Sequence, residues 1–352
     1  MGAKPLTITV VGGGIWGLAC AEACARRGAR VRLLEARRLG HGASGGIVGA
    51  MAPHTPDRWN PKKAFQFAAL DTAGTFWRHM EARTGVGSGY GRIGRAMPIL
   101  TEDARALARS RQADATENWQ GRYRWEVRDD ALPRAVAPHG AVVESLAARI
   151  HPGRAVLTLA AACRRAGVDI RENTPVARLQ SLDSDRVILA AGVGGFDLLA
   201  PFTSRHPGSG QKGQAALLGA DWRRRPQVYA DGLYLVPQDG GVLSVGSTSE
   251  GVFDHPTATD QGLDALLMRA RGMFPDLARA PVLRRWAALR PKPRKRDPML
   301  GPVPMLSGAF VALGAFKIGF GLAHHVGEVM AAAVIDGAPL PEAFSVAHHT
   351  GP

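Results

Sequence analysis

The chain begins with an apolar run, a cluster of glycines and a longer apolar stretch rich in small residues. The β-branched run at 8–11 predicts a strand, and the stretch after Gly14 predicts a helix. A second apolar run at 31–34 ends at Glu35. The order of strand, glycine turn, helix and strand predicts a β-α-β unit at the start of the chain.

The later hydrophobic pattern predicts two kinds of element. Helices are expected at 63–84, 101–112, 154–166, 260–273 and 322–335. Strands that alternate with helices are expected at 168–170, 175–179, 186–191 and 310–313. Three other segments look like antiparallel strands of a second sheet, namely 214–218, 233–237 and 242–247, and 92–100 looks like a strand pair or a strand and turn. Because β-α elements occur at the start, middle and end of the chain, we predict two interleaved domains.

The first glycines have the spacing of a dinucleotide site. Gly12 allows a tight turn, Gly14 lets the backbone approach a pyrophosphate, and Gly17 lets the helix pack close to the strand. The helix N-terminus then faces the phosphates with free N–H groups and the positive end of its dipole. Glu35 can accept hydrogen bonds from a ribose 2′-hydroxyl and disfavours a 2′-phosphate. The pattern therefore predicts FAD or NAD rather than NADP.

The composition is that of a soluble globular protein. Hydrophobic residues make up 45% and charged residues 21% of the chain. Its length of 352 residues is sufficient for two domains or lobes. We identify no signal peptide, and the best candidate for a membrane span, 310–335, contains Lys317 and Glu328. The three cysteines, Cys20, Cys24 and Cys163, lack metal-ligand spacing. They are interpreted as buried small residues, so no metal and a cytoplasmic location are expected.

The net charge of +14 leaves the kind of anionic partner open. Nucleic acid, an acidic partner and an anionic substrate would each suit a basic protein. Most of the excess is arginine scattered along the chain. The dense runs at 223–225 and 292–296 are interpreted as solvated loops.

Several further segments occur in an order that resembles a known family. They are 42–46, the helix after His151-Pro152, 187–192, Gly213-Gln214, 234–237, 245–250, 286–291, Gly301-Pro302 and 313–321. Together with the glycine turn, they make nearly the whole chain similar to the D-amino-acid oxidase superfamily of flavoproteins, in particular glycine oxidase and its sarcosine-oxidase-like relatives.

This resemblance implies an α/β fold, in which a glutathione-reductase-like FAD-binding domain is interleaved with an α+β substrate domain built on a mixed, largely antiparallel sheet. The FAD-binding domain is expected to comprise 1–62, 138–205 and 286–352. The substrate domain is expected to comprise 63–137 and 206–285.

The resemblance also implies which residues hold FAD. The segment 49–51 would run beside the isoalloxazine ring, Val176 would hold the adenine edge through its backbone, and 319–321 would open a helix aimed at the flavin N1–C2=O edge. A positive helix end there stabilises the charge that develops on reduction. The expected cofactor-binding residues are Gly12, Gly14, Ile15, Trp16, Gly17, Glu35, Ala36, Arg37, Ser44, Gly45, Gly46, Gly49, Ala50, Met51, Val176, Ala191, Gly192, Arg290, Gly314, Lys317, Ile318, Gly319, Phe320 and Gly321.

Four residues are candidates for the substrate side. Arg290 matches an arginine that grips the substrate carboxylate in glycine oxidase, a role that suits its bidentate fork, although a structural arginine is the alternative. Tyr234 matches a pocket tyrosine or is plain strand packing. Lys317 occupies the place of a second family arginine near the flavin. His54 lines the entrance to the flavin or caps a loop.

The chain also departs from the family pattern. The usual Val-Pro-Arg reads Val236-Pro237-Gln238, and a Gly-His before the C-terminal loop reads Gly314-Ala315. No cysteine matches the covalent-flavin cysteine of sarcosine oxidases, so non-covalent FAD is expected. Because of these departures, the substrate pocket can accept an amine other than glycine.

The expected activity is FAD-dependent oxidation of a primary or secondary amine or amino acid. The resemblance implies hydride transfer to flavin N5, hydrolysis of the resulting imine, and reoxidation by O2 or another acceptor. Positioning and electrostatics carry such a reaction, so no strong base is required. One alternative is a tRNA-modifying oxidase that acts on an N-carboxymethylaminomethyl-uridine, although nucleic acid is not the favoured partner. Another is a non-catalytic or partner-dependent flavin subunit of a heteromeric dehydrogenase. The sequence does not indicate an oligomeric state.

Overall fold

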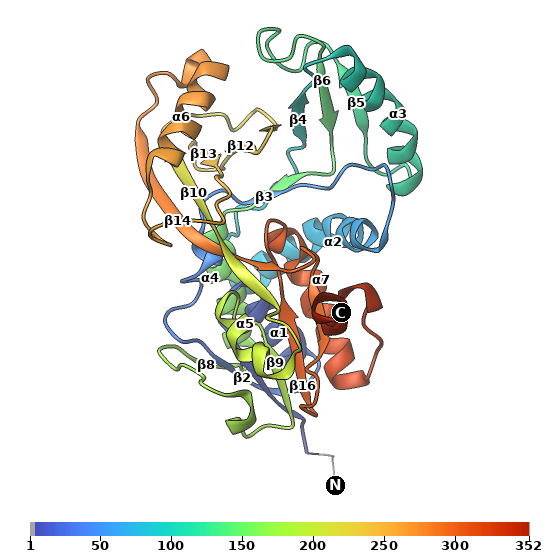
Figure 1. Ribbon diagram of the computed structural model, residues 1–352, viewed down its shortest axis with the longest axis vertical. Coiled ribbons are helices and arrows are strands. Elements are labelled where there is room, and N and C mark those ends of the chain that lie inside the picture. Colours follow the sequence, from blue (N-terminus) through green and yellow to red (C-terminus); the bar gives the residue numbers. More distant parts are fainter. Residues whose placement is uncertain (1–3, 352) are drawn as a thin grey trace.

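The computed structural model describes residues 4–351, which form two large sheets and the helices that pack on them (Figure 1). The six-stranded sheet has the order β15-β16-β9-β1-β2-β8. Its strands are β1 (Thr7–Val11), β2 (Arg30–Leu34), β8 (Asp169–Arg171), β9 (Arg186–Leu189), β15 (Met299–Pro302) and β16 (Ala309–Leu313). All neighbours pair in parallel except β15 and β16. The central strand β1 is buried because helices cover the sheet, as parallel sheets require.

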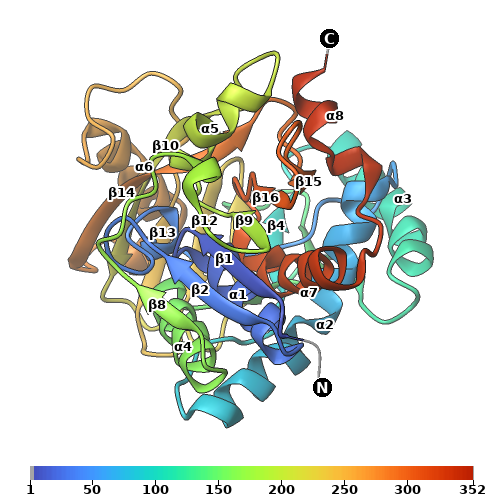
Figure 2. The same ribbon diagram turned by 90° about the horizontal axis from the view of Figure 1, so that it is seen from below.

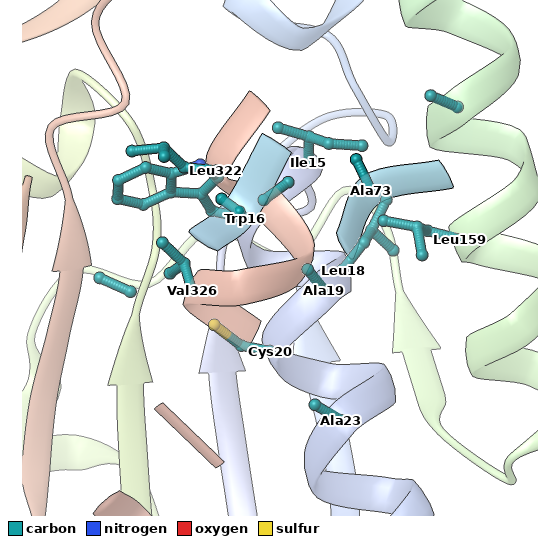
Figure 3. Packing of buried hydrophobic residues seen from close by; sticks show 14 of the residues in the cluster. Ile15, Trp16, Leu18, Ala19, Cys20, Ala23, Ala73, Leu159, Leu322 and Val326 are labelled. Atoms are coloured by element: carbon teal, nitrogen blue, oxygen red, sulfur yellow. The ribbon is translucent and has the colours of Figure 1, made fainter. Parts of the chain in front are cut away.

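Helix α1 (Ile15–Arg26) lies at the centre of this half of the molecule. It packs against α7 (Gly319–Asp336) and α4 (Pro152–Arg165), and α7 packs in turn on α2 (Pro61–Thr84) (Figure 2). Figure 3 shows Trp16, Leu322 and Val326 where α1 meets α7. Small residues on α1 let the helices approach closely, and Gly327 of α7 lies where a Cβ would overlap the backbone of Ala19.

The second sheet is mixed and has eight strands in the order β14-β10-β13-β12-β11-β4-β6-β5. They are β4 (Arg95–Pro98), β5 (Trp125–Arg128), β6 (Ala141–Glu144), β10 (Gly208–Leu218), β11 (Gln227–Ala230), β12 (Leu233–Pro237), β13 (Leu243–Gly246) and β14 (Val282–Pro293). Every pair is antiparallel except β4 with β11. The long strands β10 and β14 run side by side from this sheet toward the six-stranded one (Figure 1).

Two helices cover this part of the chain. Helix α6 (Gln261–Met273) packs on β10, β12 and β13, and α3 (Glu102–Asn118) packs on β5. The remaining elements are short: β3 (Ala50–Met51) pairs with β7 (Ala148–Arg149), and α5 (Gly194–Leu199) and α8 (Val346–Thr350) each have about two turns or fewer. The expected combination of an α/β domain with a mixed, largely antiparallel sheet is thus confirmed.

Local chemistry explains where the longer helices begin. The side chains of Asn60, Thr101 and Asp260 cap α2, α3 and α6 by accepting backbone N–H groups two or three residues further on. His151 does the same for α4 through Nδ1. These positions agree with the predicted starts at 63, 101, 154 and 260 to within a few residues.

Some sequence-based expectations were wrong in detail. No strand forms at 175–179, where Pro175 lacks a backbone donor and the chain instead enters a 3₁₀ turn at Leu179–Ser181. Helix α3 continues to Asn118, six residues beyond the expected end, because Ala115 reaches the core. Helix α7 starts at Gly319, as the resemblance implied, rather than at 322, as the hydrophobic pattern suggested. The strands β3, β5, β6, β7, β11, β14 and β15 were not expected.

The division into domains stays a prediction. If each domain follows one sheet, β6 and the part of β14 from 286 to 293 belong with the substrate domain rather than with the FAD-binding domain. We propose this change to the expected boundaries. Among residues 4–351, no helix is both long enough and apolar enough to cross a membrane.

Candidate active site

A cavity of about 1150 Å³ lies where the carboxyl ends of the parallel strands meet the second sheet. The residues that follow β1, β2 and β9 all line it, including Gly12, Glu35 and Gly192. In open α/β sheets this edge is where ligands bind, because loops diverge there and helices begin there. From the other side, Tyr229 and Tyr234 of the eight-stranded sheet also line the cavity.

The turn after β1 brings a helix N-terminus to the cavity, and its N-cap residue has no side chain to cap it. Gly12 has a φ of +113° and lies against the backbone of Ala190, so only glycine fits there. A Cβ on Gly17 would overlap the Gly12 carbonyl oxygen, which agrees with its expected packing role. Helix α1 has Gly14 at its N-cap and no acid in its first turn. The Ser44 hydroxyl accepts the Ile15 amide at 3.0 Å from a neighbouring loop.

The carboxylate of Glu35 lies at the end of β2 and is held by backbone donors. Its two oxygens accept the amides of Gly13 at 2.7 Å and Arg37 at 2.9 Å. Both bonds fix the side chain beside the glycine turn, while Glu35 still lines the cavity. This is the position from which an acid reaches a ribose hydroxyl in a dinucleotide site.

A second helix N-terminus opens onto the same cavity at α7. Gly319, Phe320 and Gly321 line it, and the N-cap residue Ile318 provides no side-chain cap. Trp16 Nε1 donates to the Gly319 carbonyl at 2.8 Å and so ties the start of α7 to the start of α1. The cavity therefore has two positive helix ends in its wall, and neither is capped by the side chain of its own N-cap residue.

The expected cofactor-binding residues come together in this cavity. All of them line it except Gly17, which packs behind the turn, and Gly45, which lies against the Gly40 carbonyl. These groups fit FAD: an acid accepts from the ribose, one helix N-terminus faces the pyrophosphate, and a second helix N-terminus faces the flavin edge. Whether each residue contacts the cofactor stays a prediction.

The side chain of Arg290, on β14, passes over a glycine of the neighbouring strand to reach the cavity. Its guanidinium donates to the Thr248 carbonyl at 3.0 Å and to the Ser247 hydroxyl at 2.5 Å. A Cβ on Gly213 of the neighbouring strand β10 would overlap this guanidinium. Burial lowers the pKa of Arg290 to about 10, and Glu250 opposes that effect. No ion pair with Arg290 is formed within the described chain.

Lys317 is a second cation in the cavity wall and also has no ion-pair partner among residues 4–351. Burial lowers its pKa, and the neighbouring cations Arg290, Arg296 and Lys292 lower it further. Arg290 and Lys317 are thus two cations in one cavity that lack a carboxylate partner in the described chain. The part of the cavity that they line is suited to binding an anion.

Tyr234 lines the cavity beside a buried arginine. Arg95 Nη1 lies 3.4 Å from the Tyr234 hydroxyl oxygen, and Nη2 donates to the Pro53 carbonyl at 3.0 Å. The carboxylate of Glu144, opposite Arg95 on β6, lies 3.1 Å from Arg95 Nε. Glu144 also accepts the amides of Leu146 and Ala147. Arg95 thus links the second sheet to the loop that carries 49–53.

His54 follows that loop and lines the same cavity. Both its backbone amide and its ring Nδ1 lie within hydrogen-bond distance of the Gln66 side chain on α2. All four candidates for the substrate side, Arg290, Tyr234, Lys317 and His54, therefore line one cavity.

Sequence reasoning missed the residues that hold these four in place. No local sequence motif marks Arg95, Glu144 or Gln66, because the residues that they contact lie far away in the sequence. Gly213 and Ser247 belonged to segments that had been matched to the family, but without a role. A polar network that joins the buried Lys212 and Gln214 to Thr248, Glu250 and Asp260 was missed as well.

The cysteines take no part in the cavity. Within the described chain Cys20, Cys24 and Cys163 are buried and free, and none lines the cavity. Burial raises the pKa of the Cys24 thiol to about 12. Residues 4–351 contain no group of three or more His, Cys, Asp or Glu side chains that could hold a metal ion.

Comparison with known proteins gives a consistent picture. The sequence profile of the family described as FAD dependent oxidoreductase matches residues 7–333. Glycine oxidase from Pseudomonas aeruginosa is 27% identical over 342 residues, covering 90% of this chain and 91% of that protein. Glycine oxidase from Geobacillus kaustophilus is 29% identical over 387 residues, covering 98% and 97%.

Solved structures show the same fold. The crystal structure of the Geobacillus kaustophilus glycine oxidase superimposes with a TM-score of 0.85 at 24% identity, covering 98% of this chain and 100% of that one. Iminodiacetate oxidase from Chelativorans sp. BNC1 gives a TM-score of 0.81 at 22% identity, covering 96% and 98%.

Proposed function

The chain belongs to the family of FAD-dependent oxidoreductases, and from this premise we propose that it oxidises a small primary or secondary amine that carries a carboxylate. The similarity to glycine oxidases supports an amino acid as substrate. The observation that carries the proposal is the pair Arg290 and Lys317, two cations that line the cavity without an ion-pair partner in the described chain.

The residues of this cavity would bind and orient such a substrate. FAD, when bound, supplies the acceptor for the hydride that leaves the carbon next to nitrogen. Arg290 would bind the carboxylate through its planar fork, and Lys317 would add to the positive potential. The cavity is lined in part by apolar side chains such as Met51 and Met97, which exclude water from the bound amine. The resulting imine hydrolyses to a carbonyl compound and ammonia or a smaller amine.

We also propose that the flavin is held without a covalent bond and that the protein works in the cytoplasm. The first point is supported by the absence of Cys20, Cys24 and Cys163 from the cavity lining. Unfolding the yellow protein and filtering it should release all of the flavin into the filtrate. Flavin retained on the unfolded chain would contradict non-covalent binding. Three free, buried thiols agree with a reducing compartment.

The proposed activity can be tested by anaerobic mixing. The flavin-loaded protein is combined with a panel of amines, and the flavin absorbance is followed. Bleaching by a carboxylate-bearing amine, such as glycine or sarcosine, is the expected result. If no amine in the panel bleaches the flavin, the proposed function is wrong. The two alternatives, a tRNA-modifying oxidase and a partner-dependent subunit, are not favoured by the comparisons.

Arg290→Ala tests the carboxylate site. The substitution should raise the half-saturating concentration of a carboxylate-bearing amine by roughly 10- to 150-fold, since a charge-assisted hydrogen bond contributes about 1.5–3 kcal/mol. An uncharged amine should change far less. Arg284→Ala, an exposed arginine on the same strand, is the matched control and should change neither. Equal effects of Arg290→Ala on both amines would remove Arg290 from the substrate site.

A further inference from the structure

The side chain of Gln66 can adopt only one orientation of its amide group. Gln66 is buried on α2, and its Nε2 lies 3.0 Å from the Ala52 carbonyl oxygen. Its Oε1 lies 2.8 Å from the backbone nitrogen of His54. A carbonyl oxygen only accepts and a backbone N–H only donates. Two backbone groups therefore fix which end of the amide is the donor and which is the acceptor.

This orientation determines the proton position on His54. The ring atom Nδ1 lies 2.5 Å from the same Gln66 Oε1, which has only lone pairs to offer. Nδ1 must therefore carry the hydrogen. In a neutral imidazole the other nitrogen, Nε2, then has the lone pair.

The surroundings favour the neutral ring. Burial lowers the pKa of His54, and the cations Lys62, Lys63 and Arg95 lower it as well, while the hydrogen bond to Gln66 opposes them. Near neutral pH the ring is then uncharged, with Nδ1–H facing Gln66.

Nε2 is the part of the ring that remains available to a ligand. No hydrogen bond within residues 4–351 uses it, and His54 lines the cavity. Three cationic side chains of this cavity wall, Arg290, Lys317 and Arg95, are donors only. Because Arg95 donates to the Tyr234 oxygen, the Tyr234 hydroxyl hydrogen is also free to point elsewhere and donate. His54 Nε2 thus provides an acceptor in the same cavity as these donors.

We propose that His54 Nε2 accepts a hydrogen bond from the N–H of the substrate amine and selects substrates that have such a hydrogen. The inference rests on the proposed function, since it concerns the same cavity. Donors such as Arg290 match the carboxylate, and the acceptor His54 Nε2 matches the amine. A neutral tertiary amine has no N–H, so this polarity admits primary and secondary amines and rejects tertiary ones.

Two small anions that are not amines isolate this hydrogen bond. Glycolate carries a carboxylate and an O–H donor, whereas methoxyacetate carries the same carboxylate and oxygen without the donor. Their affinities are measured anaerobically on the flavin-loaded protein from the perturbation of flavin absorbance. The wild-type protein should bind glycolate at least about fivefold more tightly than methoxyacetate, the effect of one hydrogen bond. His54→Phe, with normal flavin content, should bind the two equally.

A second measurement does not depend on flavin or on activity. The ¹⁵N spectrum of histidine-labelled protein, with the His54 signal identified by its loss in His54→Phe, should show Nδ1 protonated and Nε2 unprotonated. In Gln66→Glu the new carboxylate should hold a second proton on the ring, and the glycolate preference should disappear. An Nε2-protonated ring in the wild type, or a glycolate preference that survives in His54→Phe, would overturn the inference.

The two proposals fail in different ways. If amines bleach the flavin but His54 has the other tautomer, the function stands and the role of His54 is wrong. If the tautomer is as expected but neither anion perturbs the flavin, both the carboxylate site and the hydrogen bond at His54 are contradicted.

Discussion

At the scale of single residues, the site depends on buried charges that are held by partners far away in the sequence. Arg95 is 3% exposed and Glu144 is fully buried. They face each other across β4 and β6, and Arg95 also contacts Pro53 and Tyr234. A buried ion pair stabilises a fold little by itself, but losing one member leaves a charge without compensation.

Arg95→Met should therefore destabilise the protein by about 3–5 kcal/mol, since the Glu144 carboxylate would remain buried without its cation. Urea unfolding of the flavin-loaded protein measures this loss. The double variant Arg95→Met/Glu144→Gln should recover most of it, because it removes both charges. If the double variant is as unstable as Arg95→Met alone, the lost stability does not come from the unpaired carboxylate.

Gly213 is a residue whose missing side chain makes room for Arg290. Gly213→Ala should push the guanidinium away from Ser247 and Thr248 and raise the half-saturating concentration of a carboxylate-bearing amine at least about tenfold. Flavin content should not change. Gly272→Ala on α6, where a Cβ meets nothing within 4 Å, is the control and should leave the kinetics as they are. Unchanged kinetics in Gly213→Ala would show that Arg290 needs no such space.

At the scale of elements, α2 and α7 are joined by a buried histidine. The Thr72 hydroxyl of α2 donates to the Ala68 carbonyl, so its oxygen accepts from Nε2 of His324 on α7, 3.0 Å away. The His324 ring stacks on Phe76, and its Nδ1 has no partner in the described chain. Burial lowers the pKa of His324 to about 3, and the nearby His325 adds to this effect.

This histidine predicts a loss of stability in mild acid. The unfolded chain binds a proton at His324 as the pH falls through about 6.5, whereas the folded chain does so only near pH 3. Between these values the unfolded state binds more protons, so stability falls as the pH falls. The decrease in Tm from about pH 7 to about pH 5 should be smaller in His324→Gln than in the wild type. His79→Gln, an exposed histidine of α2, should leave the decrease unchanged. An equal decrease in His324→Gln would mean that other groups control it.

Elements differ in how far the sequence predicts them. The unit from β1 to Glu35 was predictable because its glycines, helix and acid lie within one short stretch and each has a local physical reason. Arg95 was not, because its partners Pro53, Glu144 and Tyr234 are brought together only by the pairing of distant strands. The strand expected at 175–179 failed for a local reason as well, because Pro175 lacks a backbone donor and no neighbouring strand of the described chain pairs with this segment.

At the scale of the whole molecule, the two basic runs prove to be different. In the run 223–225, Arg223 pairs with Asp221 and Arg225 with Asp276. In the run 292–296, no residue forms an ion pair within the described chain. The second run is also connected to the cavity, since Lys292 and Arg296 act on Lys317 and the Phe316 amide donates to the Pro291 carbonyl. The uncompensated charge of this second run therefore lies near the site.

This arrangement predicts electrostatic steering of anionic substrates. Raising the ionic strength from about 0.01 M to about 0.15 M shortens the screening length from about 30 Å to about 8 Å. For a substrate with net negative charge, kcat/KM should fall several-fold over this range, and for an uncharged amine it should stay constant. The pair Arg294→Glu/Arg296→Glu should flatten the dependence, whereas Arg223→Glu/Arg225→Glu should not. Flattening by both pairs alike would assign the effect to net charge rather than to position.

The strand order of the six-stranded sheet has a consequence for biosynthesis. The strand β9 has β1 on one side and β16 on the other, and β16 is followed directly by the segment that leads into α7. A ribosome releases β1 and the glycine turn first, but β16 and α7 only after some 300 residues have emerged. The nascent chain consequently cannot complete its flavin pocket during most of translation, and loading with FAD has to follow the emergence of the last large helix.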